Sequence, residues 1–152
     1  MSNDTYLDAL KMIGRRELSE FQVRQRLSRR GHDPSSIDSA VARLKSDRSI
    51  NDERVAGAIA RTQTSVRGRG RRRVQQQIEA AGIASSIASK AVDEVFQDLD
   101  ADALLAASLA KRLRGRERIA DDREFQRLFR YLSAQGFDTD RVLALLRKHQ
   151  PR

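Results

Sequence analysis

The sequence predicts an all-α protein of three tandem three-helix repeats, with about nine helices in an elongated, curved body. Three observations lead to this prediction. Apolar residues recur with the period of an amphipathic helix along the whole chain, and no segment shows the two-residue alternation of a strand. Three glycines also occupy matching places, 51 and 54 residues apart.

The first repeat is predicted over residues 4–48. Ser19 and Gln22 form a capping box before its second helix, and Arg15 and Arg16 close its first. Its apolar stripes cover 6–13, 23–27 and 37–44.

The second repeat is predicted over residues 51–99. Asn51 is the expected N-cap of its first helix, with Asp52 and Glu53 in the first turn, where carboxylates are favourable. Its apolar stripes cover 74–81 and 87–95.

The third repeat is predicted over residues 101–149. Asp121, Asp122 and Glu124 are expected to open its middle helix. Its apolar stripes cover 125–132 and 142–146.

The spaced glycines are Gly31, Gly82 and Gly136, and each lies four residues after a large aliphatic residue. This is the place of a left-handed residue that ends a helix, so a valine at any of them is expected to cost about 1–2 kcal/mol. A compact nine-helix globule with accidental glycine spacing is the alternative to stacked repeats.

The composition indicates an anionic partner. The 152 residues carry a net charge of +9, and 25 of the 30 cationic side chains are arginine. A guanidinium suits phosphate and carboxylate surfaces, which favours nucleic acid or an acidic protein face as the partner. A bias toward arginine codons would explain the same composition without a function.

Catalytic and metal-binding patterns are missing from the sequence. There is no cysteine, His32 and His149 lack a second ligand at helical spacing, and no phosphate-binding glycine motif is present. Asp98, Asp100 and Asp102 begin like a calcium loop, but the glycine and glutamate that such a loop needs are absent, so a linker and N-cap region is expected. We therefore expect no enzyme activity, no cofactor and no small-molecule substrate.

The sequence also bears on location. Residues 1–5 lack the basic and apolar regions of a secretory signal, and no apolar run is long enough to cross a membrane. These features predict a cytoplasmic protein without a membrane partner.

The most unusual segment is residues 67–73, Arg-Gly-Arg-Gly-Arg-Arg-Arg, here named the arginine loop. Arg71, Arg72 and Arg73 are expected in a helix first turn, where the dipole disfavours cations. Together with Arg67 and Arg69, and beside free helix N–H groups, they would cradle an anion. A solvated loop without function is the alternative. Further candidate contacts lie at helix ends: Arg29, Arg30, Arg112, Arg114, Arg116 and Arg118.

Four segments resemble the RecX family, regulators of the bacterial recombinase RecA. They are residues 15–20 (Arg-Arg-Glu-Leu-Ser-Glu) with 27–31, then 50–56 (Ile-Asn-Asp-Glu-Arg-Val-Ala), 68–83 and 132–137 (Leu-Ser-Ala-Gln-Gly-Phe). Each is weak alone, but the four stand in order at the family's spacings and cover nearly the whole chain. The chain departs from the family at Val55, where an aromatic is usual, and at Ala81 and Gln135, where basic residues are usual.

The resemblance implies three tandem three-helix repeats in an elongated arch. It also implies a monomer that binds in the groove of the RecA–single-stranded-DNA filament, contacting DNA weakly or through the filament. There it would restrain ATP hydrolysis, strand exchange and co-protease activity, and so regulate DNA repair, recombination and the SOS response. The alternative is a basic helical DNA-binding module without RecA specificity.

Overall fold

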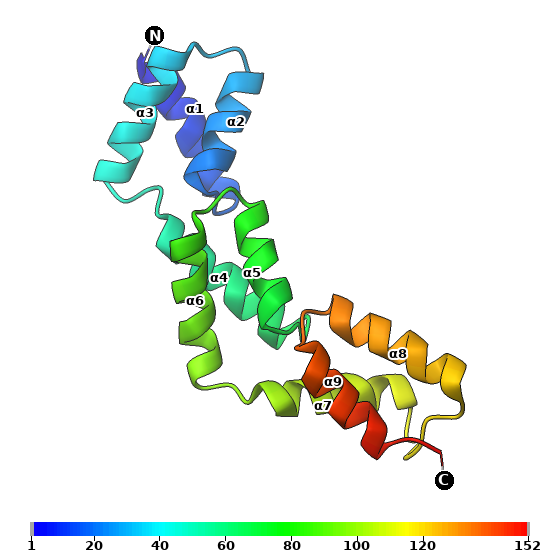
Figure 1. Ribbon diagram of the computed structural model, residues 1–152. Helices are drawn as coiled ribbons and strands as arrows, with labels where there is room; N and C mark the ends of the chain where they lie inside the picture. Colours follow the sequence, from blue (N-terminus) through cyan, green and yellow to red (C-terminus); the bar gives the residue numbers. More distant parts are fainter. Residues whose placement is uncertain (1, 152) are drawn as a thin grey trace. The chain divides into compact units, whose positions relative to one another are not determined.

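A computed structural model describes residues 2–151 of the chain, which contain nine α-helices and no strand. The prediction of an all-α protein of about nine helices is confirmed (Figure 1). The helices are α1 Ser2–Arg15, α2 Glu20–Arg29, α3 Pro34–Ser46, α4 Asp52–Ser65, α5 Arg71–Ala80, α6 Ser85–Gln97, α7 Ala101–Leu113, α8 Asp122–Ala134 and α9 Thr139–Lys148.

The predicted helix starts are confirmed where cap geometry is recorded. Ser19 accepts a hydrogen bond from the Gln22 N–H, and the Gln22 side chain accepts one from the Ser19 N–H, which completes the capping box. The Asn51 side chain accepts from the Arg54 N–H at 3.1 Å. Asp100 caps α7, as expected for a linker carboxylate.

Contacts divide the described residues into two compact units. The first unit comprises residues 2–58 and 78–91, and the second comprises 59–77 and 92–151, so the division runs through α4, α5 and α6. The boundaries of the three predicted repeats stay a prediction.

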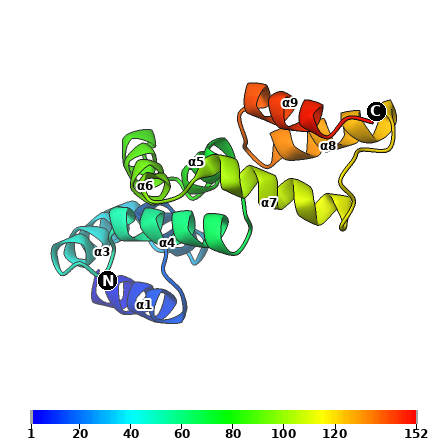
Figure 2. The ribbon, with the colours of Figure 1, turned by 90° about the horizontal axis from the view of Figure 1, so that it is seen from below.

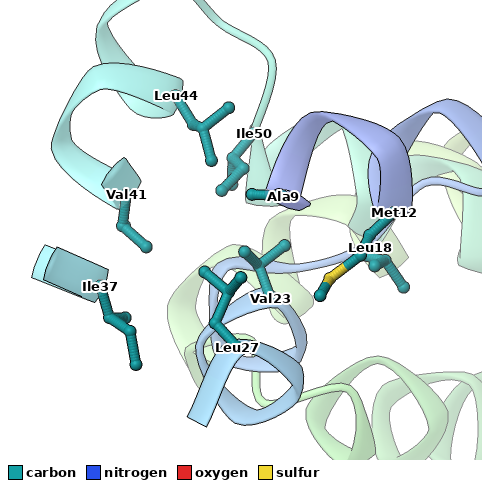
Figure 3. Packing of buried hydrophobic residues seen from close by; sticks show 9 residues of the cluster. All are labelled: Ala9, Met12, Leu18, Val23, Leu27, Ile37, Val41, Leu44 and Ile50. Atoms are coloured by element: carbon teal, nitrogen blue, oxygen red, sulfur yellow. The ribbon is translucent and has the colours of Figure 1, made fainter. Parts of the chain in front are cut away.

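The core of the first unit lies among its first three helices. α1 packs against α2 and α3, and α2 packs against α3. Leu18, Leu27 and Leu44 are almost completely buried there. Figure 3 shows nine side chains of this cluster, drawn from the three helices and the connections that follow α1 and α3.

The core of the second unit is formed by the last three helices. α8 and α9 lie side by side in both views (Figures 1 and 2), and α7 packs against both. Leu109, Leu132 and Leu146 are buried in this core. Ile119, in the connection from α7 to α8, is also buried, and its N–H donates to the His149 carbonyl at 2.7 Å, which ties the C-terminal segment to that connection.

The three spaced glycines have positive φ angles, as the helix-ending position requires: +90° at Gly31, +78° at Gly82 and +100° at Gly136.

Among the described helices, none is both long enough and apolar enough to span a membrane.

Candidate partner-binding site

The arginine loop joins α4 to α5 within the second unit. α4 ends at Ser65, and the chain folds back on the helix end, where the Gly68 N–H donates to the Thr64 carbonyl and the Arg69 N–H to the Gln63 carbonyl. Gly68 has a φ of +62°, a conformation that most residues avoid. The loop is therefore an ordered turn held by backbone hydrogen bonds.

The prediction that helix N–H groups beside the loop are free is wrong for Gly70 and Arg72. The Gly70 N–H donates to the Gln135 carbonyl at 2.8 Å, and the Arg72 N–H donates to the Gly136 carbonyl at 3.1 Å. The turn between α8 and α9 thus fills the position that an anion would take at the start of α5. An anion bound here would not have the Gly70 and Arg72 N–H groups as donors and would rely on the arginine side chains.

Two arginines of the first turn of α5 have partners that offset the unfavourable helix dipole. Arg71 forms an ion pair with Asp93 of α6 and lies 5.8 Å from the centre of the Phe96 ring. The Arg72 guanidinium donates to the Ser133 carbonyl at 3.2 Å. Both side chains remain exposed, so these contacts are weak and can be exchanged for others.

Uncompensated charge is concentrated on the other three arginines of the loop. Arg69 is half-buried and donates to the Gln63 side-chain oxygen at 2.7 Å. Desolvation lowers the pKa of Arg69, and the neighbouring charges of Arg73 and Arg67 lower it further. The Arg73 Nε is buried and has no hydrogen-bond partner among the described residues. An anion bound beside this cluster would relieve its repulsion.

Tyr131 of α8, which the sequence analysis did not single out, connects this cluster to α7. The guanidinium of Arg112 stacks on the Tyr131 ring, 3.6 Å from its centre, and Tyr131 also contributes to the electrostatic surroundings of Arg69. A depression of about 370 Å³ beside the ring is lined by Arg112, Glu124, Arg127, Leu128 and Tyr131. No sequence signal marked Tyr131, because it stands among the apolar residues of α8.

The remaining arginines after α7 differ in their surroundings. Arg114 is exposed at the end of the helix with a φ of +52°. Arg116 forms two hydrogen bonds with the Glu124 carboxylate, at 2.9 and 2.8 Å, and Arg118 donates to the Gln150 carbonyl at 3.0 Å. Arg116 and Arg118 therefore stabilise the connection from α7 to α8, whereas Arg112 stacks on Tyr131 and Arg114 is exposed.

Arg29 and Arg30 belong to the other unit, at the end of α2. Arg29 is exposed, while Arg30 pairs with Asp8, whose other oxygen lies 2.9 Å from the His32 ring.

Among the described residues, no group of three or more acidic or histidine side chains is arranged to hold a metal ion.

The Arg116–Glu124 pair gives a pH-dependent prediction. Hydrogen bonds from Arg116 and from the Ala120 N–H lower the pKa of Glu124 to about 2, from an ordinary value of about 4.3. Since the folded-state pKa is lowered, this pair stabilises the fold fully above the ordinary pKa and loses its effect as the pH falls toward 2.

We expect Arg116→Gln to raise the pKa of Glu124 toward its ordinary value and to lower thermal stability at pH 6 but not at pH 2. NMR titration of the Glu124 carboxyl and melting at both pH values measure this. The control is Arg127→Gln, because the Arg127 nitrogen lies 3.9 Å from the same carboxylate and should move its pKa little. If the two variants change the pKa of Glu124 equally, Arg116 is not the main cause of its low pKa.

Comparison with known proteins places the chain in a family. The family model for the first three-helix domain of RecX matches residues 6–44, and the model for its second three-helix domain matches residues 51–92. The chain is 32% identical over 137 residues to the regulatory protein RecX of Halorhodospira halophila, covering 90% of this chain and 82% of that protein. The chain belongs to the RecX family.

A second RecX relative and a solved structure agree with this assignment. The regulatory protein RecX of Syntrophotalea carbinolica is 34% identical over 136 residues, covering 88% of each chain. A crystal structure of RecX from Lactobacillus salivarius matches with a TM-score of 0.76 and 19% identity, over 97% of this chain and 95% of that one. At that identity the structural likeness shows the RecX fold alone. The resemblance to RecX drawn from the four sequence segments is confirmed.

Proposed function

We propose that this RecX-family chain modulates RecA, mainly as an inhibitor. It binds in the groove of the RecA–single-stranded-DNA filament in the cytoplasm and restrains ATP hydrolysis, strand exchange and co-protease activity. It acts as a monomer, by binding energy and without a cofactor or chemistry of its own. The observation that carries the proposal is membership of a regulatory family over about nine-tenths of the chain.

The arginine loop supplies a physical route to such binding. Arg67 and Arg73 both repel Arg69, so an acidic surface that approaches this cluster gains attraction and relieves repulsion together. A charge-assisted hydrogen bond is worth about 1.5–3 kcal/mol when its groups are desolvated, and much less at an exposed rim. Arg71 and Arg72, whose present partners are exposed, can add contacts at the rim.

Inhibition follows if binding selects one state of the filament. A ligand shifts a conformational equilibrium only through its differential affinity for the two states. A RecX chain that binds a filament state unable to hydrolyse ATP therefore slows turnover without touching the nucleotide.

The test is the ATPase activity of RecA on single-stranded DNA, measured while the chain is titrated in. We expect turnover to fall with a saturable dependence on the concentration of the chain. Unchanged turnover at concentrations well above those of RecA would overturn the proposal.

A basic DNA-binding module is the second candidate, favoured by the exposed arginines Arg67, Arg71 and Arg72. Its weakness is the lack of stacking platforms, because Phe21, which is 50% exposed, is the most open aromatic residue in the part of the chain that the structure describes. Binding to bare and RecA-coated strands over a salt series separates the two. A steep loss of affinity with salt on bare DNA, without preference for the coated strand, would favour the module.

A further inference from the structure

Within the first unit, the glycine turn after α5 is seated on the beginning of α2. The Ser19 hydroxyl at the start of α2 donates to the Ala81 carbonyl, a buried contact. A Cβ on Gly82 would come within 2.4 Å of the Phe21 side chain. The glycine is therefore needed both for its positive φ and for the close approach.

Within the second unit, the glycine turn after α8 is seated on the beginning of α5 in a similar manner. The carbonyls of Gln135 and Gly136 accept from the N–H groups of Gly70 and Arg72. A Cβ on Gly136 would lie 2.2 Å from the Arg73 nitrogen. In both units, the carbonyls of a turn that ends one helix accept hydrogen bonds from the start of another.

The third turn of this kind, after α2, has no such partner among the described residues. Gly31 has the same left-handed conformation, and the Gly31 and His32 N–H groups close the helix on the Ser28 and Leu27 carbonyls. A Cβ on Gly31 would meet nothing within 4 Å, and no described residue donates to the Arg30 or Gly31 carbonyl. Glycine is therefore needed at position 31 only because it adopts the positive φ angle easily.

This third turn is also held rigidly. The His32 ring lies 2.9 Å from the Thr5 hydroxyl and 2.9 Å from the Asp8 carboxylate, and Arg30 pairs with the same carboxylate. These contacts fix the turn on α1, so docking would require little ordering of the backbone. Arg29 stands exposed beside the turn and forms no ion pair with another described residue.

We propose that the turn at residues 29–32 docks on the beginning of an α-helix of a RecA protomer, one whose first turn carries acidic side chains; this rests on the function proposed above. The Arg30 and Gly31 carbonyls accept from polar groups at the start of that helix. The Gln135 and Gly136 carbonyls accept from N–H groups in this way, and the Ala81 carbonyl accepts from the Ser19 hydroxyl. Arg29 faces the acidic side chains, which are common at helix beginnings because the dipole favours them.

Two other partners for the turn at residues 29–32 fit less well. Nucleic acid is disfavoured because the turn presents carbonyls at the negative end of a helix dipole, and these repel phosphate. A second copy of the chain could offer the acidic beginning of α8, and this alternative is separated from RecA by the measurement of self-association below. Two chains of charge +9 also repel each other.

The test uses Gly31→Asn, because asparagine tolerates a left-handed conformation and its Cβ finds open space in the free protein. Gly115→Asn is the matched control, since Gly115 has a φ of +86° and equally open surroundings. Both variants should melt close to the unsubstituted protein. We expect Gly31→Asn to weaken binding to RecA-coated single-stranded DNA about tenfold or more, since its Cβ enters the docked contact, and the control to change binding less than about twofold.

A second substitution keeps the test decisive if Gly31→Asn fails to fold. Arg29→Glu reverses an exposed charge and should weaken binding severalfold, whereas Arg16→Glu, at another exposed position of the same unit, should not. Equal binding of the Gly31 and Gly115 variants, or of the two charge reversals, overturns the docking proposal while leaving the proposed function intact. Failure of the unsubstituted protein to bind the coated strand overturns both. Self-association in sedimentation that Gly31→Asn abolishes would overturn RecA as the occupant.

Discussion

Replacing Gly136 by alanine should destabilise the protein by about 3 kcal/mol or more. Left-handed strain accounts for about 1–2 kcal/mol of this, and the clash with the start of α5 for a similar amount. The Cβ would lie 2.2 Å from the Arg73 nitrogen, which is backbone and cannot move aside without breaking the hydrogen bonds that hold the two turns together.

The comparison for this prediction is Gly31→Ala, which carries the same strain without the clash and should cost about 1–2 kcal/mol. Urea unfolding of both variants measures the difference. The sequence analysis expected a similar cost at all three glycines, and the structure separates them. Equal losses at Gly31 and Gly136 would mean that the seated turn contributes nothing to stability.

Neutralising Arg67, Arg69 and Arg73 to glutamine should weaken inhibition of RecA about tenfold or more while leaving the fold at least as stable. Stability is retained because Arg67 and Arg73 repel Arg69, and because glutamine keeps the helix propensity at position 73, the one of the three that lies in α5. Inhibition weakens because an acidic surface loses three charges that would attract it. Thermal melting and the concentration for half-inhibition of the RecA ATPase are the two measurements.

The matched control removes the same charge from exposed arginines elsewhere in the second unit, with Arg123, Arg130 and Arg147 changed to glutamine. We expect this control to reduce the association rate slightly and to lose that effect at higher salt. If both triple variants inhibit equally at moderate salt, the arginine loop acts only through net charge.

Much of the local structure could be predicted because its causes are local. The capping box at Ser19, the N-cap at Asn51 and the helix-ending glycine at Gly31 each depend on residues within a few positions of one another. Helical periodicity extends over single helices, so the all-α class also followed from the sequence. The order and spacing of four short segments were sufficient to indicate the RecX family.

The candidate site could be located but not described from the sequence. The run of arginines at residues 67–73 marked the loop, whereas its neighbours come from distant positions. Asp93 pairs with Arg71 across 22 residues, and Ser133 accepts from Arg72 across 61. Glu124 likewise pairs with Arg116, one of the expected contact residues, across eight residues.

The sequence by itself determined where several helices begin and end, which faces are apolar and where positive charge is dense, because neighbouring residues along the chain decide these properties. Only the tertiary structure decided which arginines are neutralised and which glycine turns are occupied. The physical reason is that a charge or a carbonyl is free or paired according to what packs against it. For Gly82 and Gly136 that partner is a helix beginning within the chain, and for Gly31 none of the described residues provides one.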